Sequence, residues 1–121
     1  MSGLKMRVLY LGKIDTGRFR LIQTENEDIK IFSPMVAILI KHPELGTILY
    51  DTGNSPFYNY ENGKIMNEIY PLVEYISIED ALAEEGLSPR DIDLLIISHL
   101  HFDHIGGLKY FCGTKAIKKI I

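Results

Sequence analysis

Apolar and polar residues alternate near the start of this chain, and the alternation predicts a strand over Lys5–Gly12. Strand side chains point to opposite sides in turn, so one face of this strand carries Met6, Val8 and Tyr10. Residues 13–33 are mixed, polar and weakly periodic. We therefore expect a long loop there, with at most a short strand near Ile29–Phe32. Long loops in compact domains are often functional.

Two denser apolar segments predict a hairpin. Met35–Lys41 is a nearly continuous apolar run and predicts a buried strand. The segment His42–Gly46 contains a proline and ends in a glycine, which favours a tight reversal. Thr47–Asp51 then returns as the partner strand. His42 lies in the turn, and we expect it to be an exposed turn residue rather than a metal ligand.

The rest of the chain predicts a loop, a helix and two further strands. Asn54–Tyr75 is rich in Tyr, Asn, Gly and Pro, so it is expected to be a loop that packs on the core or lines a substrate entrance. Ser77 can cap a helix that ends at Gly86. The apolar run within Ile92–Ser98 predicts a buried strand. Ala116–Ile121 has the pattern of a last strand.

A cluster of potential metal ligands follows the apolar run directly. His99, His101, Asp103 and His104 place three of the four histidines and one carboxylate within six positions. Imidazole and carboxylate are ligands of Zn(II), Mn(II) and Fe(II). One or two bound metal ions are therefore the simplest explanation. The alternative is a polar cluster of surface histidines without a metal.

The spacing within this cluster suggests how the ligands divide. If the strand stays extended through His99 and His101, their side chains point the same way and can share one ion. Asp103 and His104 follow where the chain turns, so they can be directed at a second position. We expect all four residues at the carboxyl end of the Ile92–Ser98 strand, where open α/β sheets place their sites.

Two segments resemble a known family. Ser98–Gly107 (SHLHFDHIGG) resembles the signature of the metallo-β-lactamase superfamily, and its residues are most similar to those of the N-acyl homoserine lactonase branch. Gly46–Gly53 (GTILYDTG) is similar to the strand and DTG segment that precede that signature. The resemblance implies an α/β (α+β) fold, in which two similar halves build an αββα sandwich. Residues 1–121 look like the N-terminal half of one such domain, with the C-terminal half absent.

The resemblance also implies roles for individual residues. By motif position, His99 and His101 resemble ligands of a first metal, and Asp103 and His104 resemble ligands of a second. Asp103 is also the candidate catalytic residue, which would orient the nucleophile or protonate the leaving group. Asp51 of the DTG segment resembles the carboxylate that steadies a ligand histidine; alternatively, it only caps the turn after its strand.

The implied activity is hydrolysis by a dinuclear centre, in which a metal-bound hydroxide attacks a lactone or ester carbonyl. Two divalent ions are expected, with Zn(II) first and Mn(II) or Fe(II) as alternatives. The substrate would be a small lactone or ester; a glyoxalase-II-like thioesterase is the second candidate. A redox variant with iron and a flavin partner is a third. The family takes further ligands from its second half, whereas no His, Asp or Glu follows His104 here. Residues 1–121 alone are therefore expected to be inactive, and a non-catalytic half-domain is the alternative.

Composition limits the remaining choices. With 121 residues, of which 46% are hydrophobic, the chain can build one modest core but not two domains. The net charge of −3 shows no excess of positive charge for nucleic acid. The longest apolar run is far shorter than a membrane span, and no export leader is apparent. A lone cysteine, Cys112, fits a reducing cytoplasm. An apolar sheet face from Met35–Ile40 and Leu94–Ile97 would lack a covering layer, so we expect association with the missing half or self-association.

Overall fold

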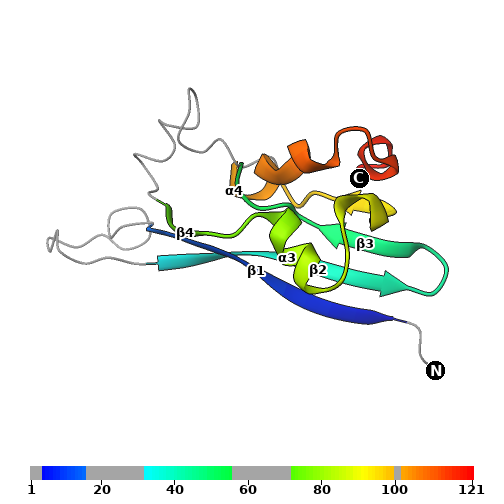
Figure 1. The fold of residues 1–121 in the computed structure, drawn as a ribbon, viewed down its shortest axis with the longest axis horizontal. Helices are drawn as coiled ribbons and strands as arrows, with labels where there is room; N and C mark the ends of the chain where they lie inside the picture. Colours follow the sequence, from blue (N-terminus) through cyan, green and yellow to red (C-terminus); the bar gives the residue numbers. More distant parts are fainter. Residues whose placement is uncertain (1–3, 16–31, 56–71, 100–101) are drawn as a thin grey trace, which may run out of the picture.

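The protein is built around one five-stranded sheet (Figure 1). A computed structural model describes residues 4–15, 32–55, 72–99 and 102–121, with the backbone alone at positions 102 and 103. The order of strands across the sheet is β4-β1-β2-β3-β5. β3 and β5 are parallel, and the other neighbours are antiparallel. The strands are β1 (Lys5–Asp15), β2 (Phe32–His42), β3 (Gly46–Tyr50), β4 (Leu72–Tyr75) and β5 (Leu94–Ile96).

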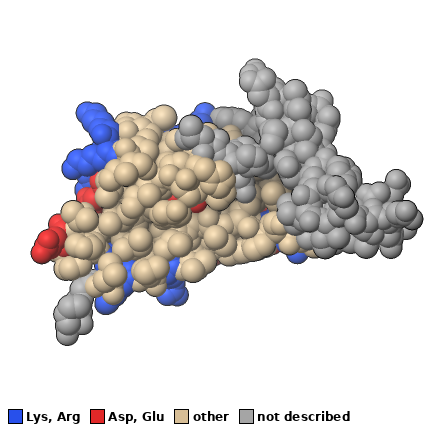
Figure 2. Space-filling view, turned by 180° about the vertical axis from the view of Figure 1, so that it is seen from behind, with Lys and Arg blue, Asp and Glu red and all other residues tan. Residues whose placement is uncertain are grey.

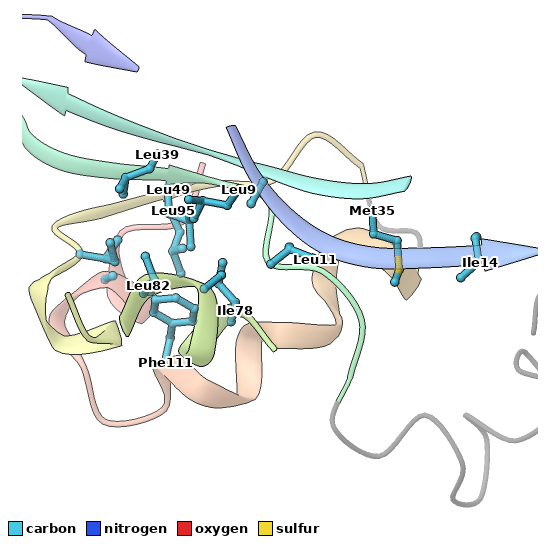
Figure 3. Packing of buried hydrophobic residues seen from close by; sticks show 14 residues of the cluster. Leu9, Leu11, Ile14, Met35, Leu39, Leu49, Ile78, Leu82, Leu95 and Phe111 are labelled. Atoms are coloured by element: carbon cyan, nitrogen blue, oxygen red, sulfur yellow. The ribbon is translucent and has the colours of Figure 1, made fainter. Parts of the chain in front are cut away.

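Short helices pack on one face of this sheet. They are α3 (Ile78–Glu84), η1 (Pro89–Asp91), α4 (Phe102–Ile105), η2 (Gly106–Phe111) and η3 (Lys115–Lys118), of which the three η elements are 3₁₀ helices. Leucines from the strands meet Ile78 and Leu82 of α3 and Phe111 of η2 in the core (Figure 3). These side chains are almost fully buried. The core therefore lies between the sheet and the helices that follow it in the chain.

The opposite face of the sheet carries exposed apolar side chains. The predicted face of β1 is this outer face, since Met6 is 63% exposed and Val8 is 66% exposed. In the neighbouring strand they pair with Ile40 and Ile38. A broad uncharged area is visible on the side of the molecule seen in Figure 2, with charged residues towards its margins. An exposed apolar face is present, but its most exposed members come from β1, whereas Met35, Leu39 and Leu95 of the segments predicted to form it are buried.

The hairpin and the helix agree with their predictions. β2 and β3 pair through a turn that ends at Gly46, whose φ of +86° suits glycine. Ser77 caps α3, because its hydroxyl oxygen accepts a hydrogen bond from the backbone N–H of Asp80 at 3.0 Å. At the other end Gly86 follows with φ of +76°. Within the described part of the chain, no helix has the length and apolar character to cross a membrane.

Some predicted boundaries are wrong. The predicted loop over residues 13–33 begins too early and ends too late, because β1 continues to Asp15 and β2 starts at Phe32. A register shift after Tyr10 lets the two strands pair again beyond the irregularity. Residues 16–31, with most of the proposed short strand, lie outside the described residues. β2 is also buried only at alternate positions, since Val36 is 39% exposed.

Three further predictions need correction. β4 lies in the segment predicted to be a loop, and it forms because it pairs with the end of β1. β5 covers only Leu94–Ile96 of the predicted Ile92–Ser98 strand. The predicted strand Ala116–Ile121 is wrong over its first part, because η3 winds there and buries Ala116 in the core, and only Ile120 forms a parallel bridge, with Leu95. The tail then meets β5 only at its end, where Ile121 N–H donates to the Leu95 carbonyl at 2.9 Å.

Candidate metal centre

The candidate site lies where the parallel strands β3 and β5 end side by side. Asp51 directly follows β3, and its backbone N–H donates to the carbonyl of Ile96 at 2.8 Å. Ser98 and His99 follow β5, and α4 then supplies His104. Parallel strands that end at one edge bring their following residues together, and this edge is where α/β sheets commonly carry sites. Segments 47 to 53 residues apart in sequence therefore meet here.

A buried carboxylate organises the site. Asp51 is 4% exposed. Its Oδ1 accepts a hydrogen bond from the Ser98 backbone N–H at 2.8 Å, and its Oδ2 accepts one from the Ser98 hydroxyl at 2.8 Å. Oδ2 also lies 2.7 Å from Nδ1 of His104. A buried carboxylate needs such donors to replace lost hydration, and these donors fix its orientation.

The backbone at Asp51 is also unusual. Its φ of +68° lies in the left-handed region, and Asp51 is the one non-glycine residue with positive φ among the described residues. Asp tolerates this conformation better than most residues, although it remains less favourable than an ordinary strand conformation. Strained conformations of this kind concentrate at functional sites. The conformation directs the carboxylate across to Ser98 and His104.

Two histidine rings converge beside this carboxylate. The ring centroids of His99 and His104 are 4.0 Å apart, with an angle of 49° between the ring planes. Nδ1 of His99 lies 3.0 Å from the Ser98 hydroxyl oxygen. The His104 side chain is 24% exposed, so one part of it is buried against Asp51 and another part is accessible. The arrangement places two imidazoles, both suitable metal ligands, at one point of the surface.

The two motif segments are locked together by backbone contacts. The N–H and hydroxyl of Thr52 both donate to the His104 carbonyl at 2.8 Å, and Gly107 N–H donates to the Thr52 hydroxyl oxygen at 3.1 Å. A Cβ added at Gly107 would collide with the Thr52 carbonyl oxygen. One added at Gly106 would collide with the backbone of Asn54 and Ser55. The two glycines are therefore needed for the close approach that holds His104 near Asp51.

The structure brings together three of the five predicted site residues. Asp51 contacts His104, and the rings of His104 and His99 lie side by side. His101 and the side chain of Asp103 lie outside the described part of the structure. Among the described residues, no three His, Cys, Asp or Glu side chains form a group that could hold a metal ion. The predicted extension of the strand through His99 is wrong, because β5 ends at Ile96 and His99 is not in a strand.

Two other residues, Ser98 and His42, are relevant to the site prediction. Ser98 was not among the predicted site residues, although its hydroxyl lies within 3.3 Å of three side chains of the site. Its position next to the first histidine was the available signal. His42 is a turn residue as predicted, because its Nδ1 accepts hydrogen bonds from the N–H groups of Glu44 and Leu45 at 3.0 Å. The described part of the motif offers the imidazoles of His99 and His104 beside the Asp51 carboxylate, and imidazole is a ligand type that suits a Zn(II)-type ion.

Relatives of this chain are lactonases by name. Over 89 residues it is 36% identical to N-acyl homoserine lactonase AiiB of Agrobacterium fabrum. The aligned region covers 69% of this chain and 32% of AiiB. Over 94% of its length it superposes, with a TM-score of 0.73 and 26% identity, on 48% of an N-acyl homoserine lactone hydrolase solved with N-hexanoyl-L-homoserine at its catalytic metal centre. AidC, a dizinc quorum-quenching lactonase, shares the fold at 23% identity and a TM-score of 0.62, over 89% of this chain and 37% of AidC.

The chain thus spans less than half the length of these relatives. Its mixed α/β fold, with a five-stranded sheet, corresponds to the N-terminal half of their fold. Residues 33–121, about three quarters of the chain, match the family described as the metallo-beta-lactamase superfamily. The chain therefore belongs to the metallo-beta-lactamase superfamily.

Proposed function

We propose that this chain contributes one half of the active site of a metal-dependent lactonase that acts on N-acyl homoserine lactones or related esters. The observation that carries the proposal is the buried Asp51 carboxylate hydrogen-bonded to His104 beside His99. A ligand histidine commonly bonds a carboxylate through its other ring nitrogen. The likeness to AiiB supports a lactone among the substrates of this chemistry.

The residues of the motif and Asp51 would have different roles in this reaction. His99, His101, Asp103 and His104 would hold two divalent ions, with Zn(II) as the first choice. Such ions polarise a carbonyl and lower the pKa of water, so that hydroxide becomes available near neutral pH. Asp51 holds His104 in one orientation. Asp103 would take a proton from the attacking water and later deliver that proton to the leaving alkoxide, which is general acid–base catalysis.

We also propose that the exposed face of the sheet is an internal surface of the active protein. Met6 and Val8 are more than 60% exposed, and the strand beside them presents Val36 at 39%. Soluble proteins rarely leave a large contiguous apolar patch uncovered. A second layer, either a C-terminal half of the same domain or a second copy of this chain, would bury it. Sedimentation velocity should therefore show association rather than a monodisperse 13.8 kDa monomer.

Reconstitution tests the proposed activity. Residues 1–121 would be assayed with zinc, alone and joined to the C-terminal half of a lactonase such as AiiB, by following the acid released when the lactone ring opens. The joined protein should hydrolyse the lactone, and both a chelator and His101→Ala should abolish the hydrolysis. The chain alone should show little turnover. Hydrolysis that survives chelation and His101→Ala would exclude the metal mechanism, and thioester hydrolysis without lactone hydrolysis would exclude the proposed substrate.

A further inference from the structure

The hydroxyl of Ser98 lies at the centre of the site. Its oxygen is 2.8 Å from Oδ2 of Asp51, 3.0 Å from Nδ1 of His99 and 3.3 Å from Nδ1 of His104. The backbone N–H of the same residue donates to the other oxygen of Asp51 at 2.8 Å. One residue between β5 and the metal motif therefore touches the buried carboxylate twice, and it also touches the side chains of His99 and His104.

Counting protons settles the direction of these hydrogen bonds. An ionised carboxylate can only accept, so each of its partners must donate. At 2.7 Å from Oδ2, Nδ1 of His104 must therefore carry a proton. The Ser98 hydroxyl has a single proton, and it points to Oδ2 of Asp51 because a charged oxygen is the stronger acceptor.

The direction of the remaining hydrogen bond, between the Ser98 hydroxyl and Nδ1 of His99, follows from this assignment. Having donated its proton to Asp51, the Ser98 oxygen still has lone pairs and can only accept from Nδ1 of His99. That ring nitrogen must also carry a proton. In both rings the lone pair of the neutral imidazole is then on Nε2, the form in which Nε2 can bind a metal ion. Asp51 sets this tautomer directly in His104 and through Ser98 in His99.

We propose that Ser98 is a positioning residue that fixes the tautomer and the orientation of His99, so that Nε2 of His99 is presented as a metal ligand. The metal-binding consequence rests on the proposed function. The proton positions do not, because they follow from hydrogen bonds within the chain.

His42 provides an internal contrast for the test. Its Nδ1 accepts hydrogen bonds from two backbone N–H groups, those of Glu44 and Leu45, at 3.0 Å each. It must therefore carry its proton on Nε2, the opposite tautomer. The same molecule thus contains a histidine of each kind, in a turn and in the site.

NMR spectroscopy can read these tautomers directly. Long-range correlation of ring protons with ring ¹⁵N nuclei would be recorded on the metal-free 121-residue chain at about pH 8.5, where free imidazole is neutral. His99 and His104 should show a protonated Nδ1, and His42 a protonated Nε2. A spectrum in which Nδ1 of His99 is unprotonated would overturn the proposal without any mutation.

Substitutions separate positioning from general stability. Ser98→Ala should release His99 into a mixture of tautomers while His104 stays bonded to Asp51, and zinc affinity should fall about tenfold or more. Ser98→Thr keeps the hydroxyl and should restore both properties. Ser88→Ala is the matched control, because the N–H and hydroxyl of Ser88 likewise bond a carboxylate, that of Asp91, away from the histidines. Ser88→Ala should leave the tautomers and zinc affinity unchanged.

The outcomes distinguish the two proposals. If the tautomers are as expected but the reconstituted protein hydrolyses no lactone, the proposed function fails and the role of Ser98 in placing the protons stands. If chelator-sensitive hydrolysis is present but Ser98→Ala changes neither the tautomer of His99 nor the affinity for zinc, the positioning role is wrong. Equal loss of zinc affinity in Ser98→Ala and Ser88→Ala would also contradict it, because the effect would then reflect stability.

Discussion

At each end of the parallel pair β3–β5, an aspartate carboxylate accepts a backbone N–H of the neighbouring segment, but the surroundings of the two carboxylates differ. At the carboxyl end, Asp51 after β3 accepts the backbone N–H of Ser98 at 2.8 Å. At the amino end, Asp93 before β5 accepts the backbone N–H of Thr47 at 2.8 Å. Each carboxylate thus fastens one strand to its neighbour. The two differ in their other partners and in burial, with side chains 5% and 34% exposed.

The partners decide what each end can do. Asp93 pairs with the ammonium group of Lys115 in η3, a fixed cation that neutralises it. The hydrogen bond from Lys115, followed by that from the Thr47 N–H, lowers the pKa of Asp93. Asp51 instead bonds a hydroxyl and an imidazole, groups whose own protons and lone pairs can be arranged for metal binding. The first arrangement stabilises the fold, and the second is the one that we propose prepares metal ligands.

The largest expected effect comes from replacing each carboxylate in turn, which tests whether Asp51 acts on the metal ligands and Asp93 only on stability. Asp51→Ala should weaken zinc binding about ten- to a hundredfold, because His104 loses the group that orients it. Asp93→Ala should leave zinc affinity unchanged. Chelator competition on the reconstituted protein measures both. Equal losses in the two variants would show that Asp51 acts only through stability, and the distinction between the ends would fail.

A glycine of the carboxyl end gives the next largest effect. Gly107→Ala should destabilise the fold by about 2 kcal/mol, because its Cβ would meet the Thr52 carbonyl oxygen in a closely packed contact. Gly86→Ala is the control, since its Cβ would meet no atom within 4 Å and only its positive φ opposes alanine. That strain costs about 1 kcal/mol. Urea unfolding compares them, and a smaller loss at Gly107 would mean that the two motif segments separate easily.

The sequence predicted the carboxyl end better than the amino end, for a physical reason. The site contains four potential ligands within six positions, His99, His101, Asp103 and His104, so the local sequence alone indicates metal chemistry. No local pattern marks Asp93, whose partners come from β3 and from η3 near the end of the chain. The role of Ser98 was likewise hidden, because it depends on a carboxylate 47 residues away.

The same distinction explains the fold predictions. β2 and β3 were found because a dense apolar run, a proline and a glycine are all local signals. β4 was missed because it has only four residues and follows Pro71 at the end of a segment whose Tyr, Asn, Gly and Pro content predicts a loop. It is a strand through its pairing with β1. Ala116–Ile121 was predicted to be a strand, whereas η3 winds over its first residues, and the ion pair of Lys115 in that helix with Asp93 requires the folded neighbour.

The smallest expected effect concerns the pH dependence of the amino end. The pKa of Asp93 is lowered on folding, so the folded state holds its proton less tightly than the unfolded state. Its contribution is therefore complete above the unfolded value of about 3.9 and is lost as the pH falls through the lowered pKa of the folded protein. Asp93→Ala should cost about 1 kcal/mol at pH 7, since it removes one backbone hydrogen bond and an ion pair that solvent screens.

Lys115→Met separates the two contributions to this effect. It removes the ion pair and keeps the hydrogen bond from Thr47, so it should cost less than Asp93→Ala and should raise the pKa of Asp93 towards its ordinary range. Urea unfolding of the three proteins at pH 7 and at pH 2.5 or below measures the difference. The stability gap between the wild type and Asp93→Ala should narrow in acid. A gap that is unchanged in acid would mean that the ionised carboxylate does not fasten β3 to β5, and Asp93 would then be no counterpart of Asp51.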